Sequence, residues 1–488
     1  MPNYKVKVKW GKENFDGIDL NSDDEPVVFK AQLFALTGVQ VDRQKIMFKG
    51  KVIGNSWDTV PLKEGMQFLM MGTADKIPEA PKEKPKFIED MSDNELTTVL
   101  DLPAGLANLG NTCYLNATVQ CLKTIPELRD ALQNYHASAH SERLYDTPGV
   151  TASLRDLFEN MDQNATVTPV VFLAVFHMAF PRFAEKSQDG HFMQHDAFEC
   201  WTSLLRSLQQ DLKIPEPPAE SGDGNEQSAI KKTVSFIESY MEGHYVVTLK
   251  NTEAEDEPET KSIEKFLHLS CFISNHEVKY LLSGLKYSIS GESVTKFSPT
   301  LQKDCLYTKR SLINRLPAYL TIEIMRYEYK GKEAKILKEI KFSMNLDVFE
   351  LCTPELQEKL SPMRTKFKEY EDKIVDIGRV PKSGHEGAIE KTEKPKFKHP
   401  YSFADDIGSN NSGYYDLQAV LTHKGRNIAS GHNVGWIRKS KDAWYQCNDD
   451  NVNMVTTEDI LKLSGGGDWH CAYLLLYGPR ILESDEPF

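Results

Sequence analysis

Residues 76–102 divide the chain into a small part and a large part. This segment begins KIPEAPKEKPKFIED and contains few apolar side chains that a core could bury. Such a composition is typical of a semi-extended linker. We therefore predict a domain at 1–75, a flexible linker at 76–102, a large domain at 103–480 and a C-terminal tail at 481–488.

The first 75 residues have the pattern of a small α+β domain. KVKVKW alternates charged and apolar residues as a half-buried strand does, and a turn and a second short strand follow. A helix is expected from Pro26 to Thr37, with Gly38 at its C-cap. The strands KIMFKGK and QFLMMG complete a ββαββ order, which buries its apolar faces as a mixed sheet curled over one helix.

The large domain changes pattern along its length. Residues 111–210 have helical periodicity, whereas 233–350 and 414–478 contain short alternating segments that indicate strands. This order predicts an α+β domain with a cleft between a helical lobe and a sheet lobe. Polar insertions, which we interpret as surface loops or disordered segments, lie near 213–232, 251–262 and 361–400.

Composition excludes several classes of protein. The net charge of −13 argues against a nucleic-acid partner and favours a basic ligand. No stretch approaches the roughly 18 apolar residues of a membrane span, and the N-terminus lacks the apolar core of a secretory signal. We therefore expect a cytoplasmic location, which the nucleus could share. The eight cysteines form no CxxC pair, so we expect no disulfide framework, no metal and no cofactor.

The segment GLANLGNTCYLNATVQCL (105–122) places Cys113 in the first turn of an expected helix. The positive end of the helix dipole favours a thiolate there. Gly105 and Gly110 allow unusual backbone conformations and would let a substrate chain pass close by. Asn108 could direct its amide at an oxyanion forming over the sulfur. A lone cysteine at a helix start is more often structural than catalytic, so a catalytic role requires a base.

The strongest candidate for that base is His432. HNVGWIRK and AWYQCN are expected to be two strands of a hairpin joined by a polar turn. If Arg438 pairs with Ala443, His432 lies opposite Asn448 or Asp449. A carboxamide or carboxylate would then orient the imidazole, as in a catalytic triad.

Two other histidines are rival bases. His423 ends a strand before the preceding loop, and His470 precedes the last strand. Neither has a polar partner that hairpin pairing predicts, so we interpret them as structural residues.

Together these segments resemble the ubiquitin-specific protease family of cysteine deubiquitinases. GLANLGNTCYLNATVQCL matches the family's Cys box, SGHNVGWIRK…WYQCNDDNV matches its His box, and QHDAFEC (194–200) lies between them. The first 75 residues resemble the ubiquitin-like β-grasp fold, a combination similar to the proteasome-associated members. The resemblance implies a papain-like fingers–palm–thumb domain that cleaves the isopeptide bond after the C-terminal glycine of ubiquitin. It also implies docking of residues 1–75 on the proteasome regulatory particle, and we expect a monomer when the enzyme is free.

The resemblance also assigns roles to individual residues. It makes Cys113 the nucleophile, His432 the general base, Asn108 the oxyanion donor and Asn448 the third member of the triad. Asp449 is the alternative third member, because its carboxylate carries a full negative charge that could stabilise an imidazolium and the amide of asparagine does not.

Further parts of the site follow from the same resemblance. Asp196 and Glu199 would pair with arginines in the tail of ubiquitin, although Asp196 also suits a helix N-terminus. The loops Lys424–Gly431 and Tyr327–Glu333 would cover the cleft of the free enzyme. The family's zinc-binding CxxC pairs are absent from this sequence, so no metal is expected. The alternative function is a non-catalytic or weakly catalytic ubiquitin-binding regulator of the proteasome.

Overall fold

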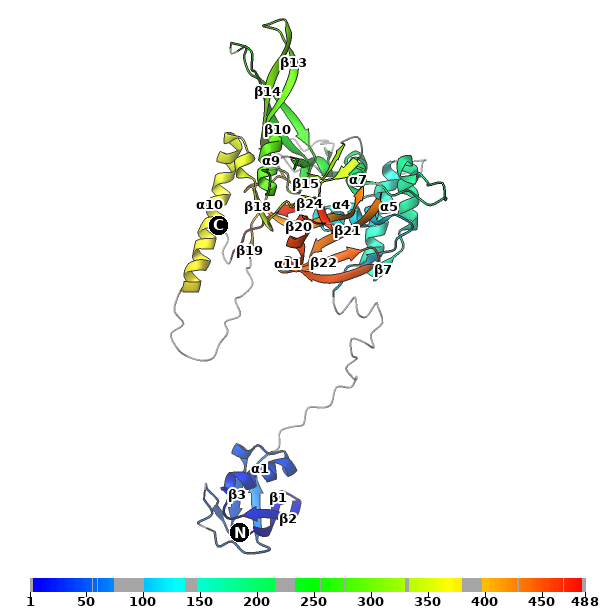
Figure 1. The fold of residues 1–488 in the computed structure, drawn as a ribbon. Coiled ribbons are helices and arrows are strands. Elements are labelled where there is room, and N and C mark those ends of the chain that lie inside the picture. The colour runs from blue at the N-terminus through cyan, green and yellow to red at the C-terminus, as the bar shows by residue number, and fades with distance from the viewer. Residues whose placement is uncertain are drawn as a thin grey trace, which may run out of the picture. The chain divides into compact units, whose positions relative to one another are not determined.

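The structure is a computed structural model of the chain. It describes residues 3–54, 56–58, 60–73, 101–136, 147–215, 233–254, 256–274, 277–329, 333–379, 397–427, 430–467 and 469–484. The chain divides into two compact units, residues 1–90 and 91–488 (Figure 1).

The first unit is a mixed sheet that packs on one helix. In the order of the sheet, the strands are β2 (Glu13–Asn21), β1 (Asn3–Trp10), β5 (Gln67–Met71), β3 (Lys45–Phe48) and β4 (Lys51–Val52), and the helix is α1 (Pro26–Thr37). Strand β1 runs antiparallel to β2 and parallel to β5. Val6 and Val8 of β1 share a core with Phe29 and Leu33 of α1. The predicted β-grasp arrangement is confirmed, and KIMFKGK differs only in dividing into β3 and β4.

The helix α1 shows how a local signal sets an element boundary. It begins at Pro26, where a missing backbone N–H costs nothing, and ends before Gly38. Gly38 has φ +69°, and its N–H donates to the carbonyl of Phe34. A left-handed residue at this position satisfies a carbonyl at the helix end, so the predicted C-cap is confirmed.

In the larger unit, the helical lobe is formed by five helices. They are α3 (Cys113–Lys123), α4 (Pro126–Gln133), α5 (Thr147–Gln163), α6 (Val170–Ala179) and α7 (Ala197–Asp211). The short strands β6 (Gly105–Leu106) and β7 (Thr166–Val167) pair in parallel beside them. This lobe corresponds to the thumb of the predicted architecture.

Two large sheets form most of the rest of the larger unit. The palm sheet has the order β12 (Leu269–Phe272), β15 (Leu320–Met325), β24 (Cys471–Pro479), β20 (Tyr414–Asn427), β21 (Ser430–Arg438), β22 (Ala443–Asn448) and β23 (Asn451–Thr456), with β18 (Asn345–Asp347) beside β20. The fingers sheet has the order β11 (Thr260–Phe266), β10 (Gly243–Asn251), β14 (Lys303–Arg315) and β13 (Ser290–Ser298). Figure 1 shows the fingers sheet extending beyond one end of the palm sheet. The predicted α+β fold is confirmed.

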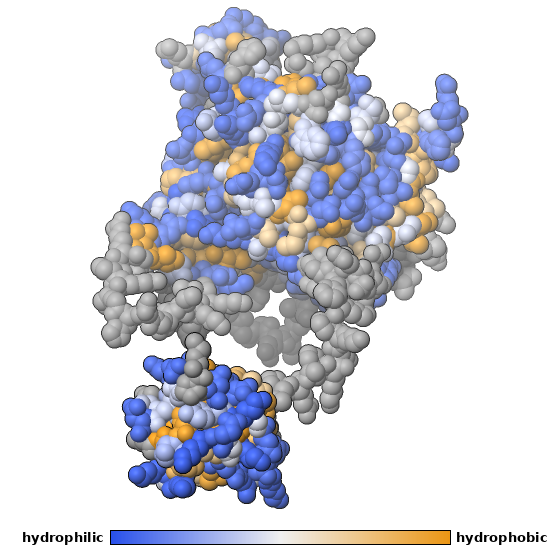
Figure 2. All heavy atoms as spheres, turned by 60° about the horizontal axis from the view of Figure 1, so that its bottom comes forward, coloured by the Kyte–Doolittle hydropathy of each residue, from blue (hydrophilic) through white to orange (hydrophobic). Residues whose placement is uncertain are grey.

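The remaining elements lie between or beside these parts. They are β8 (Lys213–Pro215), β9 (Thr233–Ser235), α8 (Phe236–Tyr240), α9 (Leu281–Ile289), β16 (Tyr327–Tyr329), β17 (Glu333–Lys335), α10 (Pro354–Arg379), β19 (Phe397–Lys398), α11 (Thr457–Leu461) and β25 (Glu483–Ser484). In Figure 1, α10 lies on the side of the palm sheet opposite α5. The face of this unit shown in Figure 2 is mostly hydrophilic, with apolar residues in separate small groups.

Strand β24 explains why part of the sequence is continuously apolar. Leu474 and Leu476 belong to the core shared with the helical lobe, whereas Leu475 and Tyr477 belong to the core on the other face. Alternate residues of a strand point to opposite faces, and both faces are covered here. The run AYLLLYG is therefore buried throughout.

Helix α10 contradicts the expectation of a loop or disordered insertion over 361–400. Residues 361–379 continue a helix that begins at Pro354. Leu356, Leu360 and Phe367 are buried at helical spacing. Three anchors along an otherwise largely polar surface give a weak periodic signal, so the sequence pattern did not reveal the helix. The part of the insertion at 380–396 lies outside the described residues.

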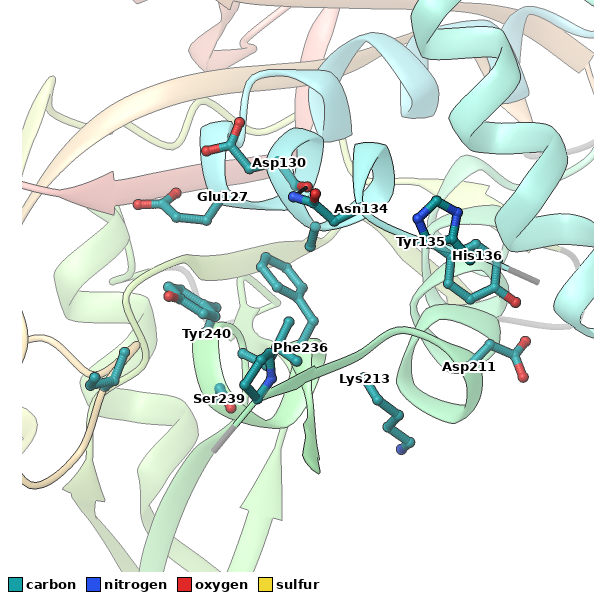
Figure 3. Close-up of a pocket in the computed structure, with 14 residues that line it drawn as sticks. Glu127, Asp130, Asn134, Tyr135, His136, Asp211, Lys213, Phe236, Ser239 and Tyr240 are labelled. Atoms are coloured by element: carbon teal, nitrogen blue, oxygen red, sulfur yellow. Dashed lines mark hydrogen bonds between the residues drawn. The ribbon is translucent and has the colours of Figure 1, made fainter. Parts of the chain in front are cut away.

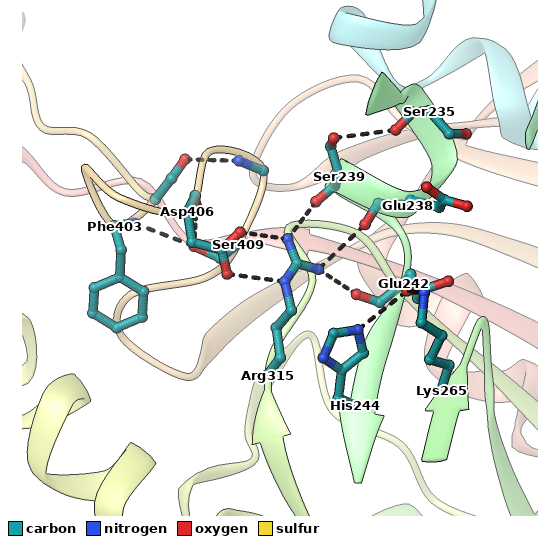
Figure 4. A network of polar contacts seen from close by, with 12 residues as sticks. Ser235, Glu238, Ser239, Glu242, His244, Lys265, Arg315, Phe403, Asp406 and Ser409 are labelled. Atoms are coloured by element: carbon teal, nitrogen blue, oxygen red, sulfur yellow. Dashed lines mark hydrogen bonds and ion pairs between the residues drawn. The ribbon is translucent and has the colours of Figure 1, made fainter. Parts of the chain in front are cut away.

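A polar network attaches the base of the fingers sheet to the rest of the unit (Figure 4). Arg315, at the end of β14, donates from Nε and Nη2 to the carboxylate of Asp406 at 2.9 and 2.7 Å. Its guanidinium also donates to the backbone carbonyls of Ser239 and Glu242. A planar group with five N–H donors can satisfy acceptors on several segments at once. Arg315 thereby connects β14, α8 and the loop at 401–410.

Candidate active site

Helix α3 packs closely against strand β21, and this contact brings the candidate residues together. A Cβ added to Gly435 of β21 would lie 3.2 Å from the carbonyl oxygen of Ala117 of α3. The absence of a side chain at 435 lets the strand approach the helix. Cys113, at the start of α3, consequently lies beside the start of β21, where His432 is found.

The turn before α3 is held by side-chain hydrogen bonds. Asn108 Oδ1 accepts from the backbone N–H groups of Gly110 at 2.9 Å and Thr112 at 3.3 Å, and Thr112 Oγ1 accepts from Leu109 N–H. Gly110 has φ +98° and Asn111 has φ +56°. The two left-handed residues reverse the chain and place Cys113 at the first position of the helix.

Cys113 is 2% exposed and has two donors against its sulfur. The backbone N–H of Asn433 donates to Sγ at 3.4 Å, and the Asn433 side-chain amide donates at 3.7 Å. Two N–H groups of Asn433 and the N-terminus of α3 therefore all face the sulfur. Asn433 was missed by sequence analysis, although it directly follows the candidate base His432 in the chain.

His432 lies between Cys113 and Asn448. The imidazole Nε2 lies 2.5 Å from Asn448 Oδ1. The pKa of His432 is raised to about 9, first by its hydrogen bond with Cys113 and then by the bond with Asn448 and nearby negative charge, against the opposing effect of burial. An imidazole with this pKa is cationic at neutral pH. The arrangement can therefore hold a thiolate–imidazolium pair oriented by a carboxamide.

The hairpin register differs from the prediction by one residue. Arg438 pairs with Trp444, whereas Ala443 accepts backbone hydrogen bonds within the turn. The last pair between the two strands is Gly435 with Cys447. His432 and Asn448 lie beyond it, where the side chains can meet without being direct ladder partners.

Asp449 binds the turn of the helical lobe rather than the imidazole. Its backbone has φ +53°, and its carboxylate accepts from the amides of Asn108 at 2.9 Å and Asn116 at 2.8 Å. The charge of Asp449 still contributes, as the smallest of the named causes, to the raised pKa of His432. Asn116 was missed by sequence analysis, although its position three residues after Cys113 places both on one side of the helix.

The structure explains why residue 105 is a glycine, which the sequence did not reveal. A Cβ at this residue would lie 2.3 Å from the carbonyl oxygen of Asp450. The prediction that Gly105 makes room for a substrate chain is therefore wrong, because the nearby backbone of 449–450 occupies that space. Around Gly110, by contrast, a Cβ would meet no atom within 4 Å.

Asp196 and Glu199 both have partners within the chain. Asp196 caps α7 by accepting from Phe198 N–H at 2.8 Å, and Tyr473 Oη donates to its other oxygen at 2.8 Å. Burial raises the pKa of Asp196. Glu199 forms an ion pair with Arg182 in which both side chains are about half exposed. The structure thus places both carboxylates at the start of α7, as the sequence indicated.

The rival histidines lie in buried sites beside the palm sheet. Burial, followed by neighbouring positive charge, lowers the pKa of His423 and of His470 to about 4. His423 Nδ1 lies 3.0 Å from Tyr327 Oη and 3.1 Å from Lys335 Nζ, and His470 Nδ1 lies 3.2 Å from Thr422 Oγ1. Both imidazoles are therefore neutral at physiological pH.

The two predicted cleft loops meet at His423. Tyr327 and Lys335, which contact it, lie on the paired strands β16 and β17. Lys424 follows His423, and its ammonium lies 4.7 Å from the ring centroid of Trp469. Asn427 pairs with Ser430, so the described part of the loop at 424–431 extends the hairpin of β20 and β21.

A pocket elsewhere in the described part of the larger unit contains none of the candidate residues. The pocket in Figure 3, about 880 Å³, is lined by α4, α8 and the end of α7, and Glu127 within it accepts from the hydroxyls of Tyr319 and Tyr401. It contains no cysteine. Among the described residues, no group of three or more His, Cys, Asp or Glu side chains could hold a metal ion. Within the same residues, no helix is both long and apolar enough to span a membrane.

Comparison with known proteins gives the family. Residues 104–477 match the family described as ubiquitin carboxyl-terminal hydrolase. Ubiquitin carboxyl-terminal hydrolase 6 of Arabidopsis thaliana is 40% identical over 98% of this chain and 99% of the relative. Ubiquitin carboxyl-terminal hydrolase 14 of Caenorhabditis elegans is 36% identical over 98% and 94%, and hydrolase 6 of Schizosaccharomyces pombe is 35% identical over 97% and 98%. The chain belongs to the ubiquitin carboxyl-terminal hydrolase family and is a cysteine deubiquitinase.

Proposed function

We propose that this deubiquitinase hydrolyses the isopeptide bond after the C-terminal glycine of ubiquitin on conjugates held at the proteasome. Cys113 is the nucleophile, His432 the general acid and base, and Asn448 the residue that orients His432. One observation carries this assignment: His432 Nε2 lies 2.5 Å from Asn448 Oδ1, and the interaction with the Cys113 side chain is the largest cause of the raised pKa of His432.

The reaction follows from this pairing. The thiolate of Cys113 attacks the carbonyl carbon of the glycine, and the imidazolium of His432 donates its proton to the departing lysine amine. A thioester between Cys113 and ubiquitin remains. His432, now neutral, takes a proton from the water that attacks this thioester, and the thiolate of Cys113 is restored as the bond to sulfur breaks. The carboxylic acid of ubiquitin that forms releases its proton to solvent.

Asn108 supplies a donor for the oxyanion. Its amide nitrogen carries two hydrogens, and the bond to Asp449 uses one of them. We assign the second hydrogen to the oxyanion, and Asp449 serves to hold the amide in position. An oxyanion donor fixed before the reaction stabilises the transition state without reorganisation.

Glu199 is the better supported of the two residues proposed to bind the tail of ubiquitin. Its present partner, Arg182, forms a half-exposed ion pair with it, and such pairs contribute little stability. Replacing Arg182 by an arginine of ubiquitin would therefore cost little. Asp196 supports the same site as the cap of α7, where its charge adds to the local negative potential.

Gating and location belong to the same proposal. The hairpins at 424–431 and 327–333 cover the cleft of the free enzyme, and the contact between Lys424 and Trp469 holds one of them. The β-grasp unit docks on the proteasome regulatory particle, the location is cytoplasmic and nuclear, and the free enzyme is a monomer. The separate core of the first unit supports an independent docking module.

The decisive experiment uses ubiquitin that carries a C-terminal electrophile, with and without proteasomes. We expect the wild-type protein to be labelled, more strongly with proteasomes, and Cys113→Ala to remain unlabelled. Cys121→Ala, which removes a buried thiol later in α3, is the matched control and should be labelled like the wild type. Absence of labelling under both conditions would favour the alternative of a non-catalytic ubiquitin-binding regulator. Deletion of residues 1–75 should abolish the effect of proteasomes but not the basal labelling.

A further inference from the structure

A second cavity, about 940 Å³ in volume, lies between the fingers sheet and the first turns of α10. Its charged lining residues come from four elements or their immediate ends: Lys250 of β10, Glu259 and Lys261 of β11, Arg310 of β14, and Glu355 and Lys359 of α10. None of the residues that line the cavity belongs to the candidate active site. Four cations and two anions leave an excess of two positive charges (4 − 2 = 2) in a chain whose net charge is −13.

The register of the fingers sheet places these cations on one face. Thr248 of β10 pairs with Lys261 on one side and with Arg310 on the other. Adjacent strands lie about 4.8 Å apart, so the Cα atoms of Lys261 and Arg310 are separated by roughly 10 Å. Lys250 lies two residues after Thr248 and therefore faces the same side. Lys359 closes the cavity from α10.

The four cations have no ion-pair partner in the described part of the chain. Lys250, Lys261, Arg310 and Lys359 make neither a side-chain hydrogen bond nor an ion pair with any residue that the structure describes. Elsewhere on the same sheet, Lys309 is paired with Glu264 at 3.4 Å and Lys303 with Glu253 at 2.6 Å. Lys261 is attracted by Glu355, but four cations against two carboxylates leave the cavity net positive, and a bound anion reduces the remaining repulsion.

We propose that this cavity binds a compact ligand that carries two or more phosphate groups. Each phosphate brings up to two negative charges and several acceptor oxygens, which matches four donors distributed over three neighbouring strands and a helix. Arg310 provides the bidentate fork, and the lysines provide mobile point charges. Because the donors come from both the fingers sheet and α10, the bound ligand links these two parts of the unit.

The test is isothermal titration of the full-length protein with inositol hexakisphosphate at an ionic strength of about 0.15 M. We expect saturable binding at one site. Arg310→Gln and Lys261→Gln should each weaken binding about tenfold, whereas Lys309→Gln, which removes a paired cation from the opposite face of β14, should change it less than about twofold. Labelling by electrophilic ubiquitin, compared with the wild type, shows that the variants are folded.

A second arm distinguishes a free ligand from a lipid headgroup, using vesicles with and without phosphatidylinositol bisphosphate. Binding to inositol hexakisphosphate alone supports the proposal with a soluble ligand, and additional binding to the charged vesicles supports it with a headgroup. The proposal is overturned if neither probe binds saturably, or if Lys309→Gln weakens binding as much as Arg310→Gln.

Discussion

Replacing Asn448 by alanine should move the pH dependence of activity in a defined direction. The bond between His432 Nε2 and Asn448 Oδ1, 2.5 Å long, stabilises the imidazolium. A hydrogen bond to a charged group contributes about 1.5–3 kcal/mol, and a pKa change of one corresponds to about 1.4 kcal/mol. Asn448→Ala should therefore lower the pKa of His432 by about 1 to 2. From the wild-type value of about 9, the pKa falls to about 7–8.

The direction of the pH shift follows from the protonation state that reacts. The thiolate of Cys113 is paired with a protonated His432, so the reactive pair is lost as pH rises through the pKa of His432. The assay is kcat/KM for a fluorogenic C-terminal amide of ubiquitin between about pH 6 and pH 10. We expect the alkaline limb of the wild type near pH 9 and that of Asn448→Ala near pH 7–8. At pH 8.5 the variant should be slower by about 3-fold if its pKa is near 8 and by about 25-fold if it is near 7.

The control is Asn453→Ala, which truncates an exposed asparagine on the adjacent strand β23. It should leave both the rate and the alkaline limb unchanged. An alkaline limb that stays near pH 9 in Asn448→Ala would refute the reasoning, because the raised pKa of His432 would then not depend on this hydrogen bond.

Three further substitutions test the framework around the site. Asp449→Asn keeps the side-chain shape but removes the charged carboxylate that accepts hydrogen bonds from two amides. We expect kcat/KM to fall about tenfold while the alkaline limb moves little. A shift of the limb as large as that of Asn448→Ala would assign Asp449 as the third member of the triad instead. Gly105→Ala forces a Cβ against the Asp450 carbonyl and should lower the free energy of unfolding of the larger unit by about 1–3 kcal/mol, measured in urea. Unchanged stability would contradict the close contact between the backbones of residues 105 and 450. Arg315→Met leaves a partly buried carboxylate and three carbonyls without their donor, so it should cost about 2–4 kcal/mol. The same substitution at the paired surface residue Lys309 should cost less than about 1 kcal/mol, and equal losses would argue against the network.

Elements with local signals could be predicted from the sequence. Helix α1 lies between Pro26 and Gly38, residues that set its ends through their own backbone properties. The strand β24 follows from a continuous apolar run. Helix α10 carries no such signal, because only a few buried residues anchor a long charged surface and Pro362 interrupts its pattern.

The candidate site was predictable in its residues but not in its details. Cys113, His432 and Asn448 come together as the sequence indicated, even though the hairpin count was wrong by one residue. The count failed because Ala443, although it begins β22, faces the loop, where its carbonyl accepts from the N–H groups of Lys439 and Ser440, and Arg438 pairs with Trp444 instead. The prediction of the pair survived because both side chains lie beyond the last ladder pair, where the register is less restrictive.

The consecutive residues Asn448 and Asp449 serve the two halves of the site separately. Asn448 belongs to β22 and binds the imidazole, whereas the left-handed backbone of Asp449 turns the next side chain toward the loop that carries Asn108. The backbone carbonyl of Asp449 also accepts from Leu106 N–H at 2.8 Å. One turn of the palm sheet thus fixes both the base and the segment that precedes the nucleophile. Because Cys113 and His432 are 319 positions apart in the chain (432 − 113 = 319), their separation in space depends on this turn and on the contact between α3 and β21. A substitution that changes the backbone of this turn should therefore disturb the positions of the nucleophile and the base together. Removal of the Asn448 or the Asp449 side chain alone should disturb only one of them.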